Sequence, residues 1–139
     1  MNTNRWELQK IARIRKKEVK KLLDSGYYSG AYYLCGYVIE CALKACIAKN
    51  TKRYDFPDKD IIQQSYTHKL EKLIEIAGLS IELDNEIRRN NIFGDNWTTM
   101  KDWKAESRYK TYSRKDAIDM YNALVARNDG VYRWVIKYW

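Results

Sequence analysis

The segment from residue 28 to residue 49 constrains the fold more than any other part of the chain. At helical spacing its small and apolar side chains centre on one face and cover most of the circumference: Ala31, Leu34, Cys35, Val38, Ala42, Ala45 and Cys46. A narrow stripe on the opposite side holds Tyr33, Tyr37, Glu40 and Lys44. A helix that is apolar on most sides is buried on most sides. The segment therefore predicts a central helix enclosed by other helices.

The residues before and after this segment also favour helices. An amphipathic helix is predicted over about residues 4–24, with a stop near Gly26. Residues 50–66 hold the single proline, so we expect a connecting loop there with at most one short helical turn. A third helix is expected to begin at Thr67, with Glu71 at capping-box distance, and to end at Gly78.

The C-terminal half predicts two more helices. Ser80 is the expected cap of a helix over about 81–93, which continues to Met100 unless Gly94–Asn96 interrupts it. Residues 101–112 are expected to form a loop. Ser113 and Asp116 begin the last helix, whose apolar positions are expected in the core or in a dimer interface: Ile118, Tyr121, Leu124, Val125, Val131, Trp134, Val135 and Tyr138.

No segment shows the alternation of a strand, and 139 residues suit one core. We therefore expect a single all-α domain over residues 1–139, built as a four- to five-helix antiparallel up-and-down bundle.

Positive charge is concentrated at the two ends of the chain. The formal net charge is +8; residues 1–21 carry +6, residues 22–100 carry −2 and residues 101–139 carry +4. The outer face of the first predicted helix is cationic, with Lys10, Arg13, Lys17, Lys20 and Lys21. Two interpretations of this face stay open: it is an ordinary solvated helix surface, or it contacts a polyanion.

Several kinds of chemistry are not expected. A single histidine disfavours a histidine-based metal site, and there is no glycine-rich phosphate loop after a strand, so we expect no metal and no cofactor. The apolar run 31–48 contains Glu40 and Lys44, which argues against a membrane span. Residues 1–5 lack the apolar region of a secretory signal.

Three cysteines, Cys35, Cys41 and Cys46, all fall within the predicted central helix and form no Cys-x-x-Cys pair. An odd number without the spacing of a disulfide framework is typical of a reducing cytoplasm, and we expect free, buried thiols.

The central helix resembles that of HEPN (higher eukaryote and prokaryote nucleotide-binding) domains, in the run YYLCGYVIECALKA from Tyr32 to Ala45. An aromatic-rich start, a Gly-Tyr pair and then Glu-x-x-Leu-Lys-Ala characterise that helix. Three further stretches resemble the family in order: Tyr66-Thr67-His68-Lys69-Leu70 with Leu73; Trp103-x-x-Glu106-x-Arg108-Tyr109; and Ser113-x-x-Asp116-Ala117 with Val131-x-x-Trp134-Val135. The resemblance covers about residues 5–136.

The resemblance implies a helical bundle that commonly forms homodimers and that often pairs with a small nucleotidyltransferase in toxin–antitoxin or defence modules. Catalytic members are metal-independent ribonucleases with an arginine followed four to six residues later by a histidine. Here no arginine has a histidine at that distance, since the only histidine is His68. No catalytic residue is therefore predicted.

We expect instead a nucleotide- or RNA-binding module. The predicted contacts are phosphate at Lys44, Arg108 and Lys110, base stacking at Trp103 or Tyr109, and a hydrogen bond from His68. Two interpretations of the ion pair expected between Glu40 and Lys44 stay open, a structural pair that orients a tyrosine and a part of the site. His68 has the alternative of packing against a loop or donating to a backbone carbonyl.

Two other functions remain as alternatives. One is a divergent metal-independent ribonuclease that uses Arg108 with His68 brought close by folding. The other is a non-enzymatic dimeric scaffold that binds an acidic partner through the first helix.

Overall fold

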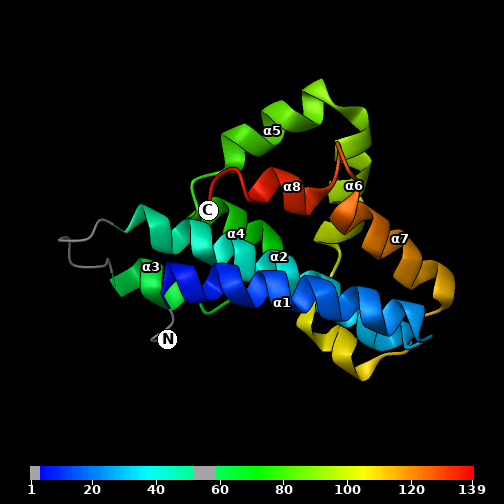
Figure 1. Ribbon diagram of the computed structural model, residues 1–139. Helices are drawn as coiled ribbons and strands as arrows, with labels where there is room; N and C mark the ends of the chain where they lie inside the picture. The colour runs from blue at the N-terminus through cyan, green and yellow to red at the C-terminus, as the bar shows by residue number, and fades with distance from the viewer. Residues whose placement is uncertain (1–3, 52–58) are drawn as a thin grey trace.

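The structure is a computed structural model, which describes residues 4–51 and 59–139. Every regular element in these residues is helical, which confirms the all-α prediction (Figure 1). Five helices have ten residues or more: α1 (Arg5–Asp24), α2 (Tyr28–Asn50), α5 (Ser80–Arg89), α6 (Asn91–Lys101) and α7 (Arg114–Val125). The shorter elements are α3 (Lys59–Gln64), α4 (Leu70–Ile76), the 3-10 helix η1 (Ala105–Tyr109) and α8 (Val131–Val135).

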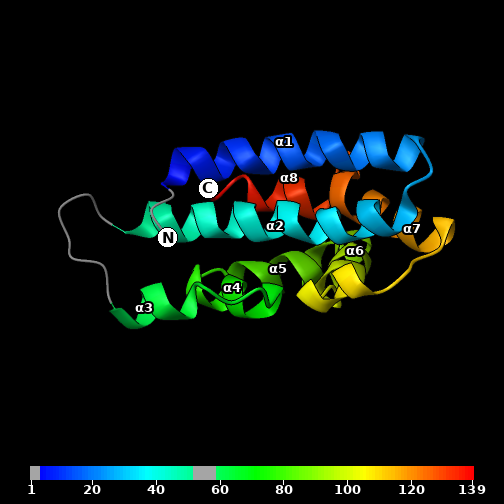
Figure 2. The same cartoon turned by 90° about the horizontal axis from the view of Figure 1, so that it is seen from below.

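The α2 helix lies at the centre, as predicted. It runs antiparallel to α1 along its whole length, and it also packs against α4, α7, α8 and η1 (Figure 2). Its side chains Cys35, Val38, Ile39 and Leu43 are fully buried. By length and hydropathy α2 could cross a membrane, but 61% of the most apolar window is buried inside the fold. Its apolar surface is thus covered by neighbouring helices, as in the core helix of a bundle.

The first helix begins and ends where the sequence predicts. Asn4 is its cap, with a capping box in which the Asn4 side chain accepts from the Glu7 backbone and the Glu7 side chain accepts from the Asn4 backbone. The chain leaves the helix through Gly26, whose φ of +81° suits a residue without a side chain. Leu8, Ala12 and Val19 face the core.

The start of the third predicted helix was placed three residues too early. The α4 helix begins at Leu70, with Lys69 as its cap residue, and Thr67 accepts a hydrogen bond from the Lys69 backbone instead of capping with Glu71. Lys69, directly before α4, is extended, and His68 beside it contacts Glu40 of α2. The predicted end at Gly78 is confirmed, with a φ of +72° there. The expected loop over 50–66 contains α3, and its residues 52–58, with Pro57, lie outside the described residues.

The break between α5 and α6 falls at Asn90, and not at Gly94–Asn96, the interruption that the sequence left open. The Asn90 side chain accepts a hydrogen bond from the Phe93 backbone and donates to Asp129 at 2.8 Å, so it caps α6 and ties it to the turn before α8. Leu79, not Ser80, holds the cap position of α5. The region expected as a loop, 101–112, contains the short helix η1.

The last predicted helix is two helices. Ser113 and Asp116 form the expected capping box of α7, but the chain turns between Val125 and Val131. A side chain at Gly130 would lie 2.6 Å from the Ala126 carbonyl oxygen, so this turn needs glycine. Val131, Trp134 and Val135 of α8 still reach the core, and Tyr121 and Tyr138 pack against it. The sequence predicted one helix here because its apolar spacing continues across the turn.

Candidate functional site

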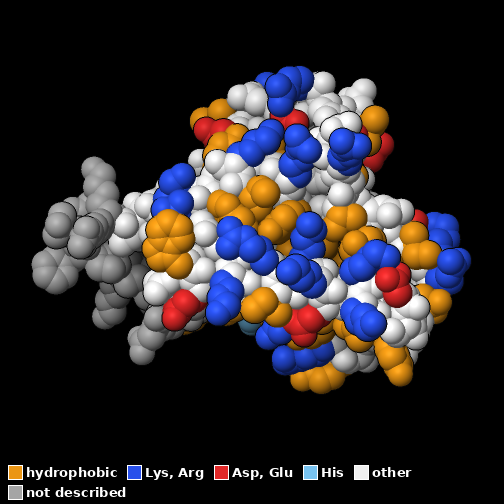
Figure 3. All heavy atoms as spheres, viewed as in Figure 1, with side chains coloured by type: hydrophobic (Ala, Val, Ile, Leu, Met, Phe, Trp, Pro, Cys, Tyr) orange, Lys and Arg blue, Asp and Glu red, His pale blue; other side chains and the backbone are white. Residues whose placement is uncertain are grey.

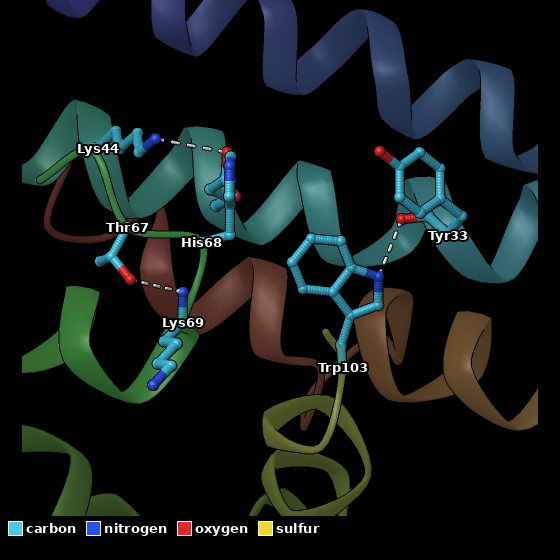
Figure 4. Close-up of polar contacts among 7 residues, drawn as sticks. Tyr33, Lys44, Thr67, His68, Lys69 and Trp103 are labelled. Atoms are coloured by element: carbon cyan, nitrogen blue, oxygen red, sulfur yellow. Dashed lines mark hydrogen bonds and ion pairs between the residues drawn. The ribbon is translucent and has the colours of Figure 1, made fainter. Parts of the chain in front are cut away.

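The stripe Tyr33, Tyr37, Glu40 and Lys44 of α2 forms the base of the candidate site. Figure 4 shows Tyr33 and Lys44 on this helix, with His68 and Trp103 beside it. The predicted Glu40–Lys44 ion pair is confirmed, with the Lys44 Nζ 3.4 Å from the Glu40 Oε2. Both side chains are buried, at 6% and 9% exposed. Two charges removed from water must be held by each other and by further hydrogen bonds. The other carboxylate oxygen of Glu40 supplies the next contact.

His68 is brought to Glu40 by the extended chain before α4. Its Nδ1 lies 2.6 Å from the Glu40 Oε1, while its side chain is 49% exposed. With an ionised carboxylate as the acceptor, Nδ1 carries the proton, and in the neutral ring Nε2 is then the atom able to accept one. A buried carboxylate thus fixes the orientation of an imidazole that is open to solvent.

Trp103 closes the other end of the stripe. Its indole Nε1 donates to the Tyr33 carbonyl oxygen at 3.0 Å, and its ring lies directly on Gly36. A Cβ at Gly36 would lie 1.9 Å from that ring, so the close approach depends on glycine. Trp103 is 2% exposed. The buried Trp103 ring therefore supports the tyrosine stripe by its contacts with α2.

Tyr37 connects the two ends. Its ring centroid lies 6.1 Å from that of His68 and 5.3 Å from that of Trp103, and Tyr33 contacts it edge-on at 4.9 Å. Burial raises the pKa of Tyr37, and the hydrogen bond with Tyr33 adds to the rise. Its hydroxyl is therefore neutral throughout the physiological range. We call Tyr33, Tyr37, Glu40, Lys44, His68 and Trp103 the His68 cluster.

Arg108 reaches the cluster from η1. Its guanidinium interacts with the Tyr33 side chain, which raises the pKa of Arg108, and it lies 4.9 Å from the ring centroid of Tyr109. Tyr109 is 78% exposed, and Lys110 is exposed beside it. The structure thus brings Arg108 next to the cluster, and it places Tyr109 and Lys110 on the open surface at its edge.

An open pocket of about 350 Å³ lies between α1 and α2 along the cluster. We call it the Tyr37 pocket; it is lined by Leu8, Ile11, Arg15, Tyr33, Leu34, Tyr37, Glu40, Cys41 and Lys44. Arg15 is the one cation that α1 contributes to this pocket, and it also pairs with Glu18 at 2.5 Å. Within the described residues no group of three or more His, Cys, Asp or Glu side chains could hold a metal ion.

Three residues of the site were absent from the predicted set: Tyr33, Tyr37 and Arg15. The helical spacing of Tyr33 and Tyr37 with Glu40 and Lys44 identifies the stripe, so this signal was available in the sequence. Arg15 carried no such signal, because its place at the pocket depends on how α1 pairs with α2. The three cysteines have free thiols, as predicted. Cys35 and Cys46 are buried, and Cys41 is partly buried.

The comparisons with known proteins agree with this architecture. The family model described as "HEPN domain" matches residues 6–137, which is nearly the whole chain. No curated protein and no solved structure matched the chain.

Proposed function

Since this chain belongs to the HEPN-domain family, we propose that it binds RNA or a nucleotide at the His68 cluster and the adjoining Arg108–Lys110 segment. The observation that carries the proposal is the 2.6 Å contact between His68 Nδ1 and the buried Glu40 carboxylate. A carboxylate held below an exposed imidazole fixes a hydrogen-bonding group before any ligand arrives, and such preorganisation reduces the ordering cost of binding.

The charges and rings around His68 suit a phosphate and a base. Arg108 and Lys110 offer cationic donors for phosphate oxygens, and the fork of Arg108 suits bidentate contact. Tyr109 offers an exposed ring on which a base can stack, a contact that tolerates any base. Lys44 is engaged with Glu40, so in this proposal its part is to hold the carboxylate that orients His68.

The test is fluorescence anisotropy of a labelled oligouridylate titrated with the full chain at low salt. We expect Arg108→Gln and His68→Asn to weaken binding by about tenfold or more, equal to about 1.4 kcal/mol for each lost charged or hydrogen-bonded contact. Arg114→Gln is the control, since it removes an exposed arginine at the start of α7. Equal binding by wild type, Arg108→Gln and His68→Asn would contradict the proposal.

A second candidate function is metal-independent RNA cleavage, and the same contact favours it. With Nδ1 bound to Glu40, the Nε2 of His68 can accept the proton of a ribose 2′-hydroxyl, whose oxygen then attacks the adjacent phosphorus. The bond from phosphorus to the 5′-oxygen breaks, the leaving oxygen takes a proton from water, to which the imidazolium of His68 returns one, and a 2′,3′-cyclic phosphate forms. Arg108 would balance the charge that develops on the phosphate.

Labelled RNA incubated with the protein in EDTA separates the two candidates. Cleavage that His68→Asn abolishes supports the ribonuclease, and bound but intact RNA supports the binding module. Glu40→Gln is informative as well, because it keeps an acceptor for His68 Nδ1 but removes the charge that stabilises an imidazolium.

We also propose that the protein is a homodimer in the cytoplasm and a component of a prokaryotic toxin–antitoxin or defence-type module with a minimal nucleotidyltransferase as partner. The family to which it belongs supports this proposal. Light scattering after size exclusion gives the mass, and co-purification from the native host identifies the partner. An acidic partner that dissociates with salt would favour the alternative of a scaffold.

A further inference from the structure

A second groove lies on the other side of α1. It has a volume of about 340 Å³ and is lined by Arg13, Lys16, Lys17 and Lys20 from α1, with Tyr121 from α7 and Tyr132 from α8. We call it the Arg13 groove. Figure 3 shows lysine and arginine side chains gathered over α1, with apolar side chains between them and few acidic ones.

The four cations share one side of α1 by their spacing, since the three lysines follow Arg13 at three, four and seven residues. They extend over about 10 Å of the helix. Like charges at this spacing repel one another and destabilise a helix. Repulsion within the row therefore destabilises the unbound protein, and a bound anion would reduce this repulsion.

Two of these cations, Arg13 and Lys16, lie over aromatic rings. The Lys16 Nζ lies 4.7 Å from the ring centroid of Tyr132, and the Arg13 guanidinium lies 4.9 Å from that of Trp139. Of the four, Lys20 alone has a carboxylate within 4 Å in the described part of the chain, that of Asp24. A cation over a ring keeps its full charge, so the groove stays positive.

The two tyrosines give the groove neutral polar groups. Burial raises the pKa of Tyr132, which the nearby Arg13 partly opposes, and burial also raises the pKa of Tyr121. Both hydroxyls are thus protonated at neutral pH and able to donate to an anion.

We propose that the Arg13 groove holds the phosphodiester backbone of a bound RNA strand, as a contact surface separate from the His68 cluster. This inference rests on the proposed RNA binding. A concave row of cations suits successive phosphates, whose charge is sequence-independent. A membrane surface would favour large, exposed apolar side chains in the groove itself, whereas its two rings are Tyr132, which is buried, and Tyr121, which is partly buried. The two grooves flank the same helix, with Arg15 in the Tyr37 pocket and Lys16 in the Arg13 groove.

The experiment compares two double variants that each lower the net charge by two. Lys16→Gln/Lys17→Gln changes the groove, and Arg88→Gln/Lys115→Gln removes two exposed cations of α5 and α7 as the control. Binding of a labelled oligouridylate is measured over a range of salt concentrations. The slope of log affinity against log salt is negative, and we expect the groove variant to make it shallower by about 1.4, because each phosphate contact contributes about 0.7 to its magnitude for a single strand. Equal slopes for the two variants would overturn the proposal.

A second measurement does not depend on the variants. Acetylation of the lysines of the wild-type protein, followed by mass spectrometry, should show Lys16 and Lys17 protected by the oligouridylate and Lys115 unprotected. Equal acetylation with and without RNA overturns the proposal, as does protection of Lys16 by phosphatidylserine vesicles but not by RNA. If the groove variant binds as the control does while Arg108→Gln still weakens binding, the groove is excluded and the proposed function stands.

Discussion

The Nδ1 of His68 lies 2.6 Å from the Oε1 of Glu40, and the other oxygen of the same carboxylate lies 3.4 Å from the ammonium of Lys44. Glu40 therefore has two partners of different kinds. One is a buried lysine whose charge it balances, and the other is an exposed imidazole that it orients. The stability of the bundle and the geometry of the candidate site thus depend on one carboxylate.

Removing that carboxylate should destabilise the fold. Glu40→Ala leaves the Lys44 ammonium buried without its partner, and breaking a buried pair in this way costs about 3–5 kcal/mol. Urea unfolding followed by circular dichroism measures the loss. The double variant Glu40→Gln/Lys44→Met removes both charges and keeps an acceptor for His68, so it should recover most of the stability. A loss as large in the double variant as in Glu40→Ala would contradict this account of the pair.

Gly36 should tolerate no side chain. Gly36→Ala forces the Trp103 ring away from α2, and overpacking of this kind costs about 1–3 kcal/mol. Thermal unfolding and tryptophan emission report the change. Gly30→Ala is the matched control in the same helix, because its Cβ would lie 3.6 Å from its nearest neighbour and alanine stabilises a helix by up to about 1 kcal/mol. Equal changes in stability for the two variants would contradict the close packing of Trp103 on Gly36.

The three thiols should react slowly in the folded protein. Burial raises the pKa of Cys35 and Cys46 to about 12 and that of Cys41 to about 11, from 9.0. Thiolate is therefore scarce in the folded state at pH 8, and iodoacetamide should modify the native protein far more slowly than the urea-unfolded protein. Because the folded pKa values are raised, these thiols favour the native state fully below pH 9, and their contribution is lost as the pH rises toward 12. Equal alkylation rates in the two states would show the thiols to be accessible.

Asn90 should contribute more to the free energy of unfolding than an ordinary helix cap does. Asn90→Ala removes the bond from the Phe93 backbone and the bond to Asp129, so we expect a loss of about 1–2 kcal/mol in urea unfolding. Asp129→Ala removes only the second bond and should cost less. Losses of equal size would place the whole effect in the contact between α6 and the turn before α8.

The helices that hold the core were predictable, and their connections were less so. Apolar spacing identified α1 and α2 because burial follows the helical period directly. The turn between α7 and α8 escaped because Val125 and Val131 both face the core, so the apolar pattern continues across it. Asn90 caps α6 through a local bond to the Phe93 backbone, but its second partner, Asp129, lies 39 residues along the chain, where no local pattern reveals it.

In the candidate site, too, contacts within one helix were predictable, and contacts between distant parts of the chain were not. The Glu40–Lys44 pair and the tyrosine stripe follow from helical spacing within one segment. The contact between His68 and Glu40 joins positions 28 residues apart and requires the chain before α4 to be extended. Local rules favoured a helix start at Thr67, and the tertiary contact of His68 with α2 overrode them.

The most direct test of the proposed site uses the chain's single histidine. Because there is one imidazole, the ring carbon–proton NMR signals of histidine-labelled protein report on His68 alone. Titration with a uridine-containing dinucleotide and with the oligouridylate should shift the His68 signals saturably, and Arg108→Gln should weaken the binding curve obtained from that shift. His68 signals that stay fixed at saturating RNA would contradict the claim that this surface binds nucleic acid.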